Sequence, residues 1–152
     1  VVALHTFDES RQIVVSSQQT PKTGNTVFGG SNGLFSTASD YMKFCRLFLD
    51  NGFTRSGELL LSPKTIELMG QNHVNDLYLN PGFGLGFAVI DHVPDTKALG
   101  SIGRLSWSGA YQTFFFIDPS ENLAAVLMTQ IAPYYGFYGS IMSQFVYQAI
   151  ND

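Results

Sequence analysis

Residues 111–129 have the sequence YQTFFFIDPSENLAAVLMT, in which two apolar runs flank a short polar turn. The first run covers residues 111–117 and the second covers residues 123–129. Continuous apolar runs of this length are typical of strands that are covered on both faces, because a strand with one face in water alternates apolar and polar residues. The DPSEN turn between them is short enough to join antiparallel neighbours. The stretch therefore predicts the centre of a buried antiparallel sheet.

Further strands precede this centre and a helix follows it. Residues 83–90 and 105–107 are rich in apolar and aromatic types, so we expect antiparallel strands across residues 82–130. Residues 137–150 then place apolar side chains at helical spacing. We therefore expect a terminal helix with one side packed against the sheet.

The segment before the sheet, residues 36–70, carries the signals of two helices. Thr37 and Asp40 have capping-box spacing, and apolar residues follow at helical spacing until an Asn-Gly pair at 51–52 ends the pattern. A Ser-Pro pair at 62–63 begins a second, short helix, because proline fits the first helical position.

Residues 1–35 are expected to be turn-rich, since pairs such as Ser-Ser, Thr-Pro and Gly-Asn interrupt any helical or strand periodicity of the apolar residues there. The order of helices, antiparallel meander and terminal helix predicts an α+β fold, with the sheet covered by helices. The chain of 152 residues, 45% of them hydrophobic, suits a single domain over residues 1–152.

Charge is scarce in this sequence. Charged residues make up 13% of it, about half of the roughly 25% usual in soluble domains. A surface this poor in charge favours packing against another part of a protein, although a complete, modestly charged domain is the alternative. The chain also begins at Val1 rather than at methionine, which fits poorly with a free-standing protein.

The charge distribution argues against nucleic acid as a partner. The net charge is −4, and the eight basic residues are scattered singly rather than gathered in a stripe that could contact phosphates. No apolar run reaches the roughly 20 residues of a membrane span, and no signal peptide is present; both a periplasmic or secreted and a cytoplasmic location stay open. The single cysteine, Cys45, excludes an internal disulfide and is predicted to be a buried thiol on the first helix.

Several short motifs imitate those of known enzymes. Ser31 stands in a Gly-x-Ser-x-Gly pattern, Lys-Thr-Gly occurs at 22–24, and Tyr-x-Asn occurs at 78–80. Each lies in a turn-rich or loop segment, whereas the chemistry requires a strand-to-helix turn or a strand at the cleft. We interpret all three as turn sequences.

Metal and cofactor signals are weak. The three histidines, at positions 5, 73 and 92, have no ligand spacing with each other or with carboxylates. The glycines at 82, 84 and 86 do not make a dinucleotide fingerprint, and no helix follows them. We therefore expect no metal and no cofactor.

Longer segments, taken in order, form a more specific pattern than these short motifs. They are GGSNGLFSTASDYMKF at 29–44, NG at 51–52, GELLLSPKTIELM at 57–69, GFGLGF at 82–87, SWSGA at 106–110, TFFFIDP at 113–119 and AVLMTQ at 125–130. In order and spacing, over roughly residues 20–150, they resemble the β-lactamase and penicillin-binding-protein family, in particular the hydrolases related to class C β-lactamases. The resemblance implies a β-lactamase/transpeptidase-like fold.

The resemblance also implies a site. Trp107-Ser108-Gly109 would correspond to the family's third motif, with Ser108 offering its hydroxyl to the substrate and the Ala110 N–H donating to the oxyanion. Trp107 stands where β-lactamases have a cation, which favours an ester or peptide over a β-lactam substrate. Gln130 and Tyr134 would border the same cleft. The alternative is that Trp107 is a core aromatic and that the serines beside it face solvent.

The family's nucleophile motif, Ser-x-x-Lys, does not occur in this sequence. The residues three positions before the four lysines are Gln19, Asp40, Leu61 and Pro94. The resemblance therefore implies the carboxyl-terminal part of a serine hydrolase that forms an acyl-enzyme. Its partners would be an ester, amide or β-lactam substrate and an amino-terminal half that carries the nucleophile, so that the chain alone would be inactive. The alternative is a non-catalytic binding module derived from the same fold.

A sheet restricted to its last strands would expose an unpaired edge. Such edges tend to pair with other chains. We therefore expect the isolated chain to self-associate or to require a complementary fragment.

Overall fold

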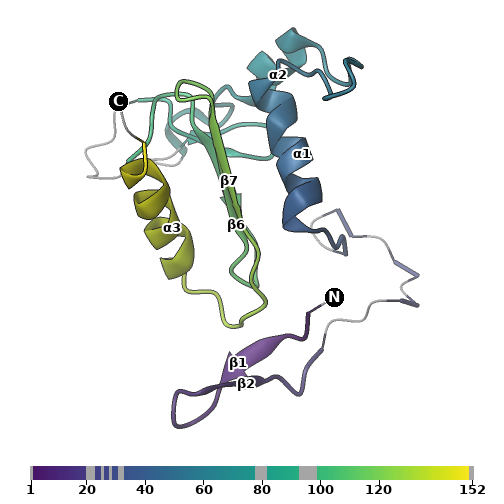
Figure 1. Cartoon of the computed structure of the whole chain (residues 1–152), viewed down its shortest axis with the longest axis vertical. Coiled ribbons are helices and arrows are strands. Elements are labelled where there is room, and N and C mark those ends of the chain that lie inside the picture. Colours follow the sequence, from purple (N-terminus) through teal and green to yellow (C-terminus); the bar gives the residue numbers. More distant parts are fainter. Residues whose placement is uncertain are drawn as a thin grey trace.

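The computed structural model describes residues 2–19, 23–24, 26–27, 29–30, 33–77, 82–92 and 99–150 (Figure 1). Its elements follow one another as β1 (His5–Phe7), β2 (Ile13–Val15), α1 (Ala38–Leu49), α2 (Pro63–Met69), a 3-10 turn η1 (Asn75–Leu77), β3 (Gly82–Phe83), β4 (Ala88–Val89), β5 (Leu105–Ser108), β6 (Phe114–Asp118), β7 (Leu123–Leu127) and α3 (Phe137–Gln148).

Within the described part of the chain, strands β3 to β7 form one antiparallel sheet in sequential order. Helices α1 and α3 lie on opposite sides of β6 and β7 (Figure 1). Phe116 and Ile117, consecutive residues of β6 that point to opposite faces, are both fully buried. The predicted α+β fold, with its double-covered central strand, is confirmed.

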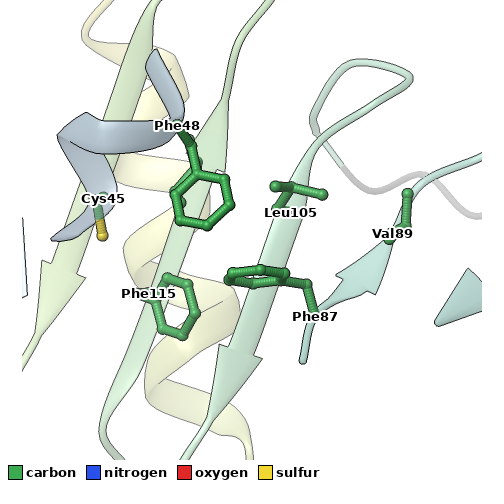
Figure 2. Packing of buried hydrophobic residues seen from close by; sticks show 7 residues of the cluster. Cys45, Phe48, Phe87, Val89, Leu105 and Phe115 are labelled. Carbon is green, nitrogen blue, oxygen red and sulfur yellow. The ribbon is translucent and has the colours of Figure 1, made fainter. Parts of the chain in front are cut away.

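The core on the α1 side is aromatic. Figure 2 shows Phe48 of α1 and Phe115 of β6 packed around Phe87, with Cys45 at the same interface. The Phe48 and Phe87 rings meet edge to face with their centroids 4.9 Å apart, a geometry worth about 0.5–1.5 kcal/mol beyond area burial. Burial raises the pKa of the Cys45 thiol to about 12, which keeps it protonated and unreactive, as predicted.

The core on the α3 side is mixed aromatic and polar. Arg104 lies over the Phe116 ring at 4.4 Å and donates to Ser143 Oγ of α3 at 2.9 Å. The buried Asp118 accepts a hydrogen bond of 2.6 Å from the Tyr147 hydroxyl of α3. Burial, and secondarily this carboxylate, raise the pKa of Tyr147. These contacts fix α3 against the back of the sheet.

Both predicted helix starts are confirmed at atomic level. The Thr37 hydroxyl accepts from Asp40 N at 3.1 Å, and the Ser62 hydroxyl accepts from Thr65 N at 3.1 Å. Each bond satisfies one of the backbone donors that the first turn of a helix leaves free. Gly52, at φ 90°, follows the end of α1 and lies so close to Leu61 O that a Cβ could not fit.

The single strand predicted for residues 83–90 is wrong. It is a hairpin of two short strands, β3 and β4, joined by a turn in which Gly86 adopts φ 94°. A Cβ at Gly84 would overlap Met69 O. The chain therefore turns against the end of α2 instead of continuing as a strand.

The expectation of turns alone in residues 1–35 missed the β1–β2 hairpin, which pairs His5 with Val15. All three residues of β2 are exposed, so no alternation of buried and exposed positions marks the strand. The apolar run at 111–117 also begins with a turn, since β6 starts only at Phe114. Strand β7 likewise ends at Leu127, before the predicted limit at Thr129.

Candidate functional site

A hollow of about 1410 Å³ lies between the start of α1, the β1–β2 hairpin and one end of strands β5 to β7. Strand β5 contributes Trp107 and Ser108 to its wall, the turn after β5 contributes Gly109, and the segment after β7 contributes Gln130. The remaining wall is mainly apolar, with Phe35 and Met128 as examples. Four of the six residues predicted for the site therefore line one concave surface.

The turn between β5 and β6 is built around Gly109. Gly109 N donates to Thr113 O at 2.9 Å, and Gln112 N donates to Gly109 O at 2.9 Å. A Cβ at Gly109 would overlap Thr113 Oγ1. Gln112 reverses the chain with φ 67°. Glycine is required at this position because Thr113 Oγ1 lies close to its backbone. This contact and the two backbone hydrogen bonds fix the shape of the turn.

Ala110 is exposed at the tip of this turn, and its N–H donates to no group in the described ranges. The neighbouring N–H groups of Gly109 and Gln112 are both used inside the turn. Ala110 does not itself line the hollow, although Gly109 beside it does. A free backbone donor at the rim is the arrangement expected of an oxyanion site.

Trp107 is 49% exposed, and its ring packs edge to face against Phe83 with the centroids 4.9 Å apart. The alternative interpretation of Trp107 as a core aromatic is therefore wrong. Strand β4 pairs with β5 only as far as Ser106. Beyond that point, the outer edge of β5 has no strand partner in the described part of the chain, which leaves the edge beside Trp107 accessible.

Ser108 and Tyr134 meet although they lie 26 positions apart. The Tyr134 hydroxyl donates to Ser108 Oγ at 2.9 Å. Tyr134 does not line the hollow, so it reaches the site through Ser108. Gln130 serves the site with its backbone, since its carbonyl accepts from His5 N at 2.8 Å and so holds the β1–β2 hairpin to the end of the sheet.

Sequence reasoning missed Gln112, which is 2% exposed. Its Nε2 donates to Pro133 O at 3.1 Å, and its Oε1 accepts from Tyr135 N at 3.3 Å. The signal that could have revealed it is a lone amide within an otherwise apolar stretch, because a buried amide needs partners on both of its polar atoms.

The wall of the hollow carries little charge among the described residues. Asp40 lines it, while no lysine or arginine of the described residues does. A hydrogen bond from Lys43, with a smaller one from Thr37, holds the pKa of the Asp40 carboxyl below its usual range. Among the described lining residues, therefore, no lysine or arginine is available to an anionic ligand, and the nearby Lys43 is paired with Asp40.

The three imitative motifs lie wholly or partly outside the described residues, at Ser31, Lys22 and positions 78–80. In the ranges that are described, no group of three or more His, Cys, Asp or Glu side chains is placed to hold a metal ion. The helices of those same ranges are all too short or too polar to cross a membrane.

The chain matches one protein-family model and two curated proteins. Residues 5–138 match the family model described as Beta-lactamase. Two curated relatives from Mycobacterium tuberculosis, "Uncharacterized protein MT1414" (strain CDC 1551 / Oshkosh) and "Protein Rv1367c" (strain ATCC 25618 / H37Rv), are 34% identical over 115 residues. That region is 66% of this chain but only 28% of each relative.

Two solved structures share the fold. The LovD6 mutant of simvastatin synthase (LovD) from Aspergillus terreus superposes with a TM-score of 0.71 at 21% identity, covering 97% of this chain and 42% of that one. EstCE1, described as a hydrolase with promiscuous acyltransferase activity, superposes with a TM-score of 0.71 at 22% identity, covering 95% and 43%. The chain thus spans less than half of each of these two structures.

Proposed function

Because this chain belongs to the beta-lactamase family, we propose that it supplies one wall of the active site of a serine hydrolase that works through an acyl-enzyme. The observation that carries the proposal is the Ala110 N–H, which has no acceptor among the described residues and follows Trp107, Ser108 and Gly109 at the rim of the hollow. The turn holds this donor in place before any substrate binds. Preorganised donors of this kind stabilise charge that develops during acyl transfer.

The chemistry assigned to this wall is oxyanion stabilisation. When a serine oxygen attacks an ester carbonyl, the new C–O bond pushes an electron pair onto the carbonyl oxygen. The Ala110 N–H donates to that oxygen. The pair then returns as the bond to the leaving oxygen breaks, and the proton that the serine gave to the base supplied with Ser-x-x-Lys passes to that oxygen, which leaves as the alcohol. Water then attacks the acyl-serine and gives a proton through the same base to the serine oxygen, so that the acid is released and the serine hydroxyl is restored. Loss of one oxyanion donor typically costs about 10²–10³ in kcat.

The nucleophile itself would come from outside these residues. No lysine of the chain has a serine three positions before it, and the chain spans 28% of the curated relatives that it matches. We propose that an amino-terminal part of the same domain carries Ser-x-x-Lys and closes the hollow. The mainly apolar wall and the 13% charge content support such packing.

A neutral ester is the substrate class that we favour. The wall that this chain contributes presents no lysine or arginine from the described residues, so a substrate carboxylate would find no cation on this side of the hollow. Trp107 and Phe83 offer an aromatic surface to an acyl chain instead. The description of EstCE1 as a hydrolase with promiscuous acyltransferase activity agrees with this choice.

The test compares two polypeptides, residues 1–152 alone and the longer protein that contains them. We expect the longer protein to hydrolyse p-nitrophenyl butyrate and residues 1–152 to give only the background rate. A fluorescent penicillin is an independent probe of the nucleophile. Stoichiometric labelling of residues 1–152 alone would contradict the proposal. A parent sequence without Ser-x-x-Lys before Val1 would also contradict it and would favour the non-catalytic binding module.

A further inference from the structure

The segment after β7 is attached to the β5–β6 turn. The Thr129 hydroxyl donates to Tyr111 O at 2.7 Å, and Ile131 N donates to the same oxygen at 3.3 Å. These bonds bring the chain that leads to α3 alongside the turn that carries Ala110. The two segments therefore form one hydrogen-bonded rim.

Gln112 completes this attachment with its side chain. Its amide N–H reaches Pro133 O and its amide oxygen reaches Tyr135 N, at 3.1 and 3.3 Å. These two partners flank Tyr134 in the sequence, so the buried amide fixes the backbone on both sides of that tyrosine. A side chain that is 2% exposed and uses both polar atoms has little freedom to move.

Tyr134, held in this way, donates to Ser108 Oγ at 2.9 Å. A serine hydroxyl has one proton to donate and can accept through its oxygen. Because Ser108 already accepts from Tyr134, its own proton remains available for an acceptor. Ser108 lines the hollow, so that acceptor can be an oxygen of a bound ligand.

We propose that Gln112 is a positioning residue for substrate binding, acting through Tyr134 to orient the Ser108 hydroxyl as a donor to an oxygen of a neutral acyl ester. The inference rests on the proposed function of the cleft. Tyr134 and Ser108 form a neutral donor pair, and the hollow lacks cationic lining among the described residues. A carbonyl or ester oxygen accepts from such a pair without the need for a counter-charge.

A purely structural role for Gln112 makes a different prediction. Such a role would lower the thermal midpoint and leave the KM of the folded enzyme unchanged. A positioning role raises KM in folded protein, and it does so only while Tyr134 retains its hydroxyl. Two measurements therefore distinguish the two roles. One is whether KM rises while kcat stays the same, and the other is whether the effects of the Gln112 and Tyr134 substitutions on KM are non-additive.

The first experiment uses the longer protein with a p-nitrophenyl ester. We expect Tyr134→Phe and Ser108→Ala each to raise KM about fivefold with kcat within about twofold, because each removes one hydrogen bond. The double variant should be no worse than the poorer single variant, since both changes break the same contact. The control is Tyr138→Phe, a tyrosine of α3 outside this network. An unchanged KM, or fully additive effects, would overturn the inference.

The second experiment tests Gln112 itself. Gln112→Ala should raise KM about as much as Tyr134→Phe does. In the double variant, Gln112→Ala should cause no further rise in KM beyond that of Tyr134→Phe alone. Gln112→Asn is the companion variant, because asparagine tolerates the observed φ of 67° but is too short to reach both partners. The matched control is Gln148→Ala, at the exposed end of α3.

Amide hydrogen exchange supplies a readout that does not depend on turnover. We expect the Tyr135 N–H to exchange at least about tenfold faster in either Gln112 variant, because its acceptor is removed. An unchanged exchange rate in folded variants would refute the positioning role. If the parent protein hydrolyses no ester at all, the proposed function fails, and the exchange measurement still decides whether Gln112 holds the segment.

Discussion

Gly109 shows how one residue sets the geometry of the candidate site. Its missing Cβ lets Thr113 Oγ1 lie against the backbone, and its N–H and C=O both close the turn. That turn leaves the Ala110 N–H unused by the residues that the structure describes. At this scale the resemblance predicted that residues 107–110 belong to the site, but it gave no reason for the glycine other than substrate approach. Contact with Thr113 is a second reason.

We expect Gly109→Ala to destabilise the protein by about 1–3 kcal/mol, because the added methyl group overpacks the turn. Urea unfolding followed by circular dichroism measures this change. Removal of the opposing hydroxyl in Gly109→Ala/Thr113→Ala should recover most of the loss. Gly30→Ala is the matched control, since a Cβ there meets no atom within 4 Å. A loss of equal size in Gly30→Ala would contradict the explanation.

At the scale of elements, the sequence alone predicted the features that depend on neighbouring residues and missed those that depend on distant contacts. The capping residues of α1 and α2 and the apolar run of β6 act within a few positions, and the sequence alone predicted them. The break between β3 and β4 depends on Gly84 meeting Met69 O, a contact across the fold. Gln112 likewise finds its partners 21 and 23 positions away. A local pattern contains no information about such partners.

The α1 cap provides a prediction at this scale. Thr37→Ala should reduce the free energy of unfolding by about 1 kcal/mol, because the Asp40 N–H loses its acceptor. Thr37→Ser, which keeps the hydroxyl, should retain most of the stability. Ser39→Ala serves as the control, since it alters an exposed residue inside the same first turn. A thermal midpoint that falls equally in Thr37→Ala and Ser39→Ala would exclude the cap as the cause.

At the scale of the whole molecule, β7 forms one edge of the five-stranded sheet. Strand β7 pairs with β6 and, in the part of the chain that the structure describes, with no other strand. The hollow opens beside the end of β7, and Met128 there is 37% exposed. The predicted unpaired edge therefore coincides with an apolar concavity, a combination that favours association.

We expect residues 1–152 alone to self-associate. Sedimentation velocity should show a weight-average mass that rises with concentration. Met128→Lys should shift the distribution towards monomer, because a charge on this surface resists burial in an apolar contact. Lys64→Met removes an exposed charge from α2, away from the hollow, and therefore controls for the change in overall charge and composition. A compact monomer at all concentrations would contradict the prediction.

The sequential order of β3 to β7 has a consequence for how the chain folds. Every ladder in this meander joins strands that are neighbours in the sequence, so the sheet has a low contact order. Proteins dominated by such local pairings cross their folding barrier quickly, because little loop entropy is lost before contacts form. We therefore expect the meander to assemble early and by itself, and the slow step to be the later docking of whatever segment pairs with the outer edge of β7.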